Sequence, residues 1–159
     1  FKAGTCDLVT TDGSGLYGNR AAETAAGTPG ADAWVIFPEA PISKEPLGPA
    51  TRQGDDQWFD IIQWTVFATF IAEENGVTSA NVDDMMEDTP ELVRLFGGEG
   101  ELQTTMGLQN TAFLEVVKQV GNYGEIFERN LTGPLGLELE GSFNMQWYDG
   151  GLIYAPPAR

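Results

Sequence analysis

The carboxylate of Asp12 is the side chain in this sequence best placed to bind a ligand. It directly follows a β-favouring run, Cys6–Thr11, and directly precedes Gly13. In open α/β domains, ligands bind just beyond the carboxyl ends of strands, where loops and helix starts meet. A carboxylate there only accepts hydrogen bonds, so it suits the three donors of an ammonium group. The spacing alone leaves another role open, because Asp12 could simply shape its turn or cap the following helix.

Other familiar chemistries lack the residues that they need. The sequence has no histidine, which excludes a Ser/His/Asp triad, a Cys/His pair and the usual zinc sites. The glycines of Gly13–Gly18 follow an aspartate and lack the lysine of a phosphate loop. The acidic residues Asp83, Asp84, Glu87 and Asp88 lack the alternating spacing and the glycine of a calcium loop, so we interpret them as a solvated helix face. We therefore expect no metal, no cofactor and no catalytic residue.

The amino-acid composition limits the classes of partner that the chain can bind. Apolar residues make up 42% of the 159 residues, enough for a domain with a hydrophobic core. The chain has 8 basic and 24 acidic residues, a net charge of −16. This charge argues against nucleic acid, whose phosphates need basic patches, and against anionic membrane surfaces.

The cysteine content and the apolar pattern lead to expectations about disulfide bonds and membrane insertion. Cys6 is the only cysteine, so the chain forms no internal disulfide, and we expect this residue to be a small buried hydrophobe. The longest apolar stretch is interrupted by Gln63, Thr65 and Thr69, so we expect no direct membrane insertion.

The elements expected around Asp12 begin with short strands. Cys6–Thr11 is rich in β-favouring residues and ends at Asp12-Gly13, where a helix starts. Ala33–Phe37 is an almost continuous apolar run ended by proline, which predicts a buried strand. Leu47–Thr51 is a candidate for a third short strand.

A long helix is predicted from about Gln57 to Glu74. Asp55 or Asp56 can cap its first amides, and Asn75-Gly76 can end it through a left-handed residue. Large apolar residues occupy most of its circumference, so we expect it to be buried on at least two sides. These residues are Trp58, Phe59, Ile61, Ile62, Trp64, Val66, Phe67, Phe70 and Ile71.

Shorter helices are expected downstream. They cover Ser79–Met86, Pro90–Phe96, Thr111–Val120 and Tyr123–Asn130, each bounded by glycine, proline or a capping residue. The remainder from Leu131 is rich in glycine and proline.

Five segments, in one order along the chain, resemble the periplasmic amino-acid-binding proteins that feed ABC importers, and in particular the general L-amino-acid-binding subfamily. These segments are Cys6–Leu16, Ile42–Trp58, Ser79–Asp83, Gln119–Asn130 and Tyr154–Pro157. The resemblance implies an α/β protein with the type II periplasmic-binding-protein fold, here incomplete. Residues 1–44 would form the end of lobe two with the hinge crossing. Residues 45–159 would form the C-terminal part of lobe one and a helical extension.

The resemblance also implies a function. The two lobes would close over an L-amino acid without changing it, and Asp12 would hold its ammonium group. The arginine that grips the substrate carboxylate and the aromatic wall of the pocket would lie upstream of Phe1, together with the signal peptide of an exported, periplasmic protein. The partners would be an L-amino acid, bound only with the missing N-terminal half, and the membrane subunits of an ABC importer.

Two other classes of function remain open from the sequence. One is a structural role, in which a truncated lobe self-assembles through uncovered apolar faces; the hydrodynamic mass of the chain would distinguish it. The other is an enzyme on the same two-lobe scaffold, which the missing histidine and the single carboxylate candidate disfavour.

Overall fold

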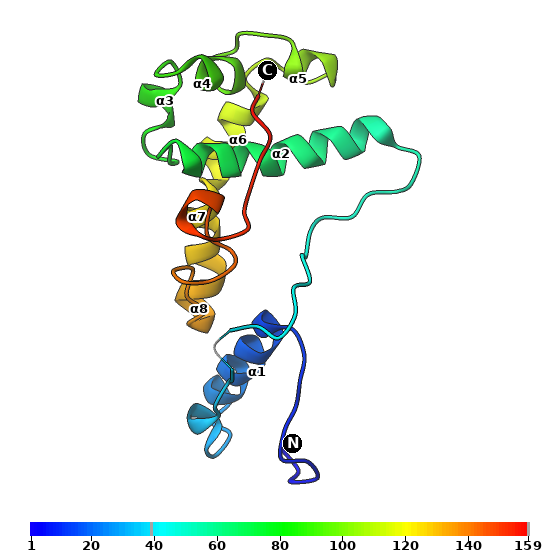
Figure 1. Cartoon of the computed structure of the whole chain (residues 1–159), viewed down its shortest axis with the longest axis vertical. Helices are drawn as coiled ribbons and strands as arrows, with labels where there is room; N and C mark the ends of the chain where they lie inside the picture. The colour runs from blue at the N-terminus through cyan, green and yellow to red at the C-terminus, as the bar shows by residue number, and fades with distance from the viewer. Residues whose placement is uncertain (39, 159) are drawn as a thin grey trace. The chain divides into compact units, whose positions relative to one another are not determined.

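The described residues, 1–38 and 40–158 of a computed structural model, are mostly helical and divide into two compact units (Figure 1). The first unit contains Phe1–Leu47 and Arg129–Glu138. The second contains Gly48–Glu128 and the segment that begins at Leu139. The boundary between two lobes at residues 44 and 45 stays a prediction.

The first unit is built around helix α1 (Gly13–Ala25), which begins where the sequence predicted a helix start. A short helix η1 (Ala31–Ala33) and α8 (Gly133–Leu135) contact it. The π-helix η2 (Glu128–Thr132) leads into α8. Ala31 is the only fully buried apolar residue of this unit among those described, so its hydrophobic core is small.

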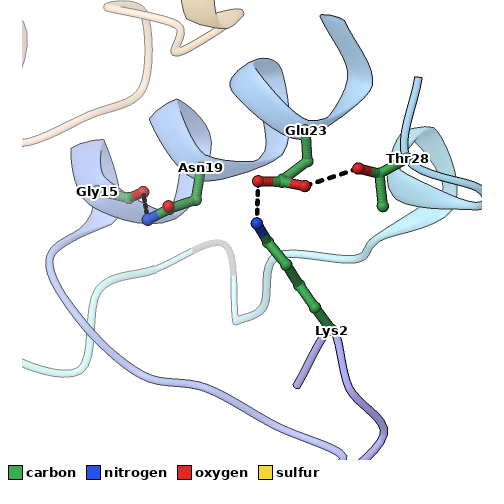
Figure 2. A network of polar contacts seen from close by, with 5 residues as sticks. All are labelled: Lys2, Gly15, Asn19, Glu23 and Thr28. Atoms are coloured by element: carbon green, nitrogen blue, oxygen red, sulfur yellow. Dashed lines mark hydrogen bonds and ion pairs between the residues drawn. The ribbon is translucent and has the colours of Figure 1, made fainter. Parts of the chain in front are cut away.

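Polar contacts tie the N-terminal residues to α1 (Figure 2). The Glu23 carboxylate binds the Lys2 ammonium and accepts a hydrogen bond of 2.7 Å from the Thr28 hydroxyl. These contacts, Lys2 first, lower the pKa of Glu23. Nearby, the Arg20 guanidinium lies 5.0 Å from the centre of the Tyr17 ring. Cys6 is exposed, contrary to prediction, and its sulfur accepts a hydrogen bond from the N-terminal ammonium.

The predicted strands Cys6–Thr11, Ala33–Phe37 and Leu47–Thr51 are wrong for this structure. Within residues 1–38 and 40–158 no strand forms, and the isolated bridge joins Gln146 to Ile153. Instead most apolar side chains of these runs are exposed, with Val35 at 78% and Leu47 at 75%, whereas Trp34 and Ile36 are half-buried. A strand needs a neighbouring backbone to satisfy its N–H and C=O groups, and these three segments pair with none of the described residues.

Helix α2 (Asp56–Glu74) is the longest element of the second unit, and its ends follow the predicted signals. The Asp55 carboxylate accepts a hydrogen bond of 3.2 Å from the Trp58 amide. At the other end Gly76 takes a φ of 69°, and the Val77 amide donates to the Ala72 carbonyl. This left-handed ending satisfies carbonyls of the last turn that otherwise lack partners.

Burial of α2 is confined to its C-terminal half. Ala68, Ile71 and Ala72 are fully buried, where α6 (Ala112–Val120) and α7 (Tyr123–Phe127) pack against the helix (Figure 1). At the other end, Trp58 is 50% exposed and Phe59 48%. The expectation of a helix buried on two sides is therefore wrong for its first turns.

Short helices complete the second unit's core. They are α3 (Val82–Met85), α4 (Pro90–Leu95) and α5 (Leu102–Thr105), followed by α6 and α7. The helix predicted over Ser79–Met86 is thus shorter than expected, whereas α4 and α6 match. The segment Tyr123–Asn130 is helical throughout, as α7 and the first part of the π-helix that follows it. The fully buried apolar side chains with the largest volumes are Phe96, Phe113, Ile71, Leu92, Leu95, Val77, Val82 and Val117.

The C-terminal residues run over this core. The Ala158 amide donates to the Glu91 carboxylate, and the Ala158 carbonyl accepts from the Arg94 guanidinium at 3.0 Å. Ala155 and Ala158 are both buried. The end of the described chain is therefore held to α4 by both polar groups of one residue.

Candidate functional site

Asp12 lies immediately before the first turn of α1 in the first unit. Its backbone is extended (φ −53°, ψ 145°), and its carbonyl accepts the Leu16 amide at 3.0 Å, which makes it the residue that starts the helix. Its side chain is exposed and makes no capping hydrogen bond to the helix. The carboxylate therefore does not serve as a side-chain cap, one of the roles that the sequence left open.

Gly15, in the first turn of α1, leaves space for the Thr11 side chain next to Asp12. A Cβ at Gly15 would lie 3.2 Å from Thr11 Cγ2, so a larger residue would push against the Thr11 side chain. The Gly15 carbonyl accepts a hydrogen bond of 2.7 Å from the Asn19 side chain (Figure 2). The start of a helix leaves its first amides without partners within the helix, and these amides attract anions.

The candidate site thus combines two kinds of group. The Asp12 carboxylate can pair with a cation, and the adjacent free amides of α1 can hydrogen-bond an anion. A zwitterion whose ammonium and carboxylate groups are substituents of one carbon atom matches such a pair. The sequence identified the carboxylate, but it gave no signal for the role of the adjacent amides, because any helix start exposes them.

The hollow in the second unit offers a different environment. It has a volume of about 380 Å³, and its lining residues are Glu87, Asp88, Thr89, Pro90, Val93, Arg94 and Glu99. Asp12 does not line it. Three carboxylates and one guanidinium line this hollow, and that guanidinium already donates to the Ala158 carbonyl. We therefore do not take this hollow as the candidate site.

The acidic run in α3 and after it forms no metal site. Across the part of the chain that the structure describes, no three acidic or thiol side chains are grouped so that they could hold an ion. Asp83 instead pairs with Lys118 of α6 at 2.6 Å, and Asp84, Glu87 and Asp88 are exposed. None of the described helices combines the length and apolar character needed to span a membrane.

Comparison with known proteins relates the whole chain to periplasmic binding proteins, although no family model matches it. It is 49% identical over 162 aligned positions to the general L-amino acid-binding periplasmic protein of Rhizobium johnstonii. It is 45% identical over 161 to the glutamate/glutamine/aspartate/asparagine-binding protein of Rhodobacter capsulatus. Each alignment covers 100% of this chain and 46% of the relative, so the chain spans about half the length of these relatives.

A solved structure gives the same relationship in three dimensions. It is described as an ABC transporter periplasmic binding protein from Brucella ovis with glutathione bound. The two chains superpose with a TM-score of 0.86 at 44% identity, over 100% of this chain and 49% of the other. The resemblance predicted from five sequence segments is confirmed, and these relatives carry names of binding proteins rather than of enzymes.

Proposed function

We propose that this chain forms part of the substrate-binding component of an ABC importer, which captures L-amino acids in the periplasm. The observation that carries the proposal is identity of 45–49% along the whole chain with two proteins named as amino-acid-binding. In this proposal the chain contributes the end of lobe two and part of lobe one of a type II periplasmic-binding-protein fold. Lobe closure, not catalysis, retains the ligand. The membrane subunits of the importer are the protein partners.

Asp12 is the proposed contact to the substrate ammonium. Its exposed carboxylate, free of a capping hydrogen bond, supports this role, as does its position beside the free amides of α1. Those amides could receive the substrate carboxylate, since both charges of an L-amino acid sit on substituents of one carbon atom.

The test uses a hybrid receptor. The 159 residues replace the matching segment of the Rhizobium johnstonii relative, and calorimetry measures binding of a panel of L-amino acids. We expect the hybrid to bind within about tenfold of the parent receptor, which corresponds to about 1.4 kcal/mol. A folded hybrid that binds no L-amino acid would count against the proposed function.

Asp12→Asn in the hybrid then tests the residue. Removing one member of a buried charge pair costs about 2–5 kcal/mol, so binding should weaken by roughly thirty-fold or more. Asp7→Asn is the matched control, because it removes another exposed carboxylate of the same segment, and its affinity should be unchanged. If both variants bind equally well and melt at the same temperature, Asp12 is not a ligand contact.

Binding of a γ-glutamyl peptide is a second candidate, supported by the glutathione in the Brucella ovis structure. The γ-glutamyl group keeps a free α-ammonium and a free α-carboxylate, the same head group as an L-amino acid. The same calorimetry therefore includes glutathione and N-acetylglutamate, which lacks the ammonium. Binding of glutathione that is lost on Asp12→Asn, with no binding of N-acetylglutamate, would favour recognition through this shared head group.

A further inference from the structure

Among the described residues of the second unit, two buried side-chain oxygen atoms lack a hydrogen-bond donor. They are Glu73 Oε2, in the last turn of α2, and Gln146 Oε1, in the C-terminal segment. The Gln146 residue is only 2% exposed. An amide oxygen and an ionised carboxylate can only accept hydrogen bonds. A buried acceptor without a donor costs about 1–3 kcal/mol, so each of these two atoms requires an explanation.

These two side chains are partners. The Gln146 side chain hydrogen-bonds the Glu73 carboxyl, as does the backbone N–H of Gly124 at the start of α7. Gln146 Nε2 also donates to the Phe70 carbonyl at 3.2 Å. An amide and a carboxylic acid can pair at two points, with an N–H donating to the acid and the acid O–H donating to the amide oxygen. Here the second donor is the only missing part.

The electrostatic surroundings favour a proton over a negative charge. Burial raises the pKa of Glu73 above 4.5, the charge of Asp149 adds to this, and the hydrogen bonds from Gln146 and Gly124 oppose it. Glu73 lies at the negative end of a 19-residue helix whose last turn has no basic residue.

The other titratable groups around Glu73 are acidic or neutral. Glu74 neighbours it on α2, and Tyr148 and Asp149 lie in the short helix η3 (Trp147–Asp149). On α7, burial and then the charge of Glu73 raise the pKa of Tyr123 to about 12, so Tyr123 stays neutral at physiological pH. A proton on Glu73 would remove a negative charge from this group.

We propose that the Glu73 carboxyl is a proton-binding site: a proton on Oε2, donated to Gln146 Oε1, completes an acid–amide pair that fastens the C-terminal segment to α2 and α7. Loss of the proton leaves both oxygen atoms without a donor and loosens the segment. The proposal concerns the stability of the second unit and does not depend on amino-acid binding.

The segment that the pair would hold is short and has few other contacts to α2. Trp147 Nε1 donates to the Glu74 carboxylate at 3.1 Å, and the Trp147 amide donates to the Ile153 carbonyl at 2.9 Å. The Trp147 side chain is 53% exposed, so its contact with Glu74 contributes little by itself. The indole N–H resonance of Trp147 is therefore a suitable reporter of the loosening.

The sign of the pH dependence follows from the raised pKa. The folded chain holds this proton more tightly than the unfolded chain, whose glutamate has a pKa of about 4.3. The stabilisation is fully present below that value and is lost as the pH rises through the pKa of the folded state. Each unit of separation between the two pKa values changes the folding equilibrium constant about tenfold.

The experiment is a carbon-detected NMR titration of the whole chain between pH 3 and 9, with Glu73→Gln as the test variant. In the wild-type chain we expect the Glu73 carboxyl carbon to titrate above pH 4.5. The chemical shifts of the Gln146 side-chain amide and of the Trp147 indole N–H should change along the same titration curve. Glu73→Gln supplies an N–H in place of the proton, so in this variant both chemical shifts should lose the step that follows the Glu73 titration. Unfolding should lose only the part of its pH dependence that comes from Glu73.

Asp60→Asn is the matched control, since it removes an exposed carboxylate from the same helix and should leave the Glu73 titration unchanged. The proposal is overturned if the midpoint of the Glu73 carboxyl titration lies at or below pH 4.5. It is also overturned if the chemical shift of the Gln146 side-chain amide does not change along the Glu73 titration. If Glu73→Gln does not fold, the titration of the wild-type chain decides by these same two criteria.

Discussion

Single polar side chains connect parts of the second unit that are separated along the chain. Gln103, in α5, is 3% exposed and uses every part of its amide. Its Nε2 donates to the carbonyls of Leu95 and Asn110 at 3.1 and 2.6 Å, and its Oε1 accepts the Phe113 amide at 2.8 Å. One residue thereby satisfies the end of α4 and the start of α6. Buried backbone groups of this kind rarely lack a partner.

Replacing Gln103 with leucine should destabilise the chain by at least about 2 kcal/mol. The change leaves two carbonyls and one amide without their donor or acceptor, and each such group costs about 1–3 kcal/mol when it stays buried. Gln109→Leu, at an exposed position in the same loop region, is the control and should change stability by less than about 0.5 kcal/mol. Urea unfolding of both variants measures the difference. Equal stabilities would show that water replaces the amide at position 103.

At the scale of elements, local signals determine where the helices begin and end. Asp55 accepts the Trp58 amide at the start of α2, and Thr89 accepts the Leu92 amide at the start of α4. Asn122 and Glu125 form a reciprocal capping box at the start of α7. All these contacts span three residues, so the sequence could predict the helix starts without any knowledge of the fold.

The end of α2 gives a test at this scale. Gly76→Ala should destabilise the chain by about 1–2 kcal/mol. A residue with a Cβ is less stable by this amount in the left-handed conformation, because its Cβ lies too close to the following carbonyl oxygen. The φ of Gly76 is 69°, and a Cβ there would meet no other atom within 4 Å, so the backbone conformation alone is tested. Gly48→Ala, which also has open space but no left-handed φ, should be neutral or slightly stabilising. Thermal unfolding compares the two, and equal melting temperatures would contradict this account.

At the scale of the whole chain, apolar surface remains uncovered in both units. Val35 and Phe37 in the first unit are 78% and 66% exposed, and Trp58 and Leu152 in the second are 50% and 55% exposed. The amino-acid-binding relatives are about twice as long as this chain. The proposed alternative of self-assembly through such surfaces is not favoured by the relatives' names, which describe binding proteins.

We expect the 159-residue chain by itself to bind free L-amino acids no more tightly than about millimolar, or about −4 kcal/mol. Asp12 is exposed to water, where a pair between a carboxylate and an ammonium contributes at most about 1 kcal/mol. Calorimetry with the isolated chain measures this, and the hybrid receptor serves as the positive control. Micromolar binding by the isolated chain would show that it holds a complete site.

The sequence by itself determined where α2, α4, α6 and α7 begin, that a helix follows Asp12, and the resemblance to periplasmic amino-acid-binding proteins. Caps and turns depend on residues within four positions of one another, and the resemblance depends on the order of short segments. Only the tertiary structure decided which apolar runs are buried. Ala33–Phe37 has the composition of a buried strand, yet none of its residues is fully buried, because burial and pairing need a second surface. The pairing of Glu73 with Gln146 was likewise beyond the sequence, because two residues so far apart along the chain carry no local signal for the contact.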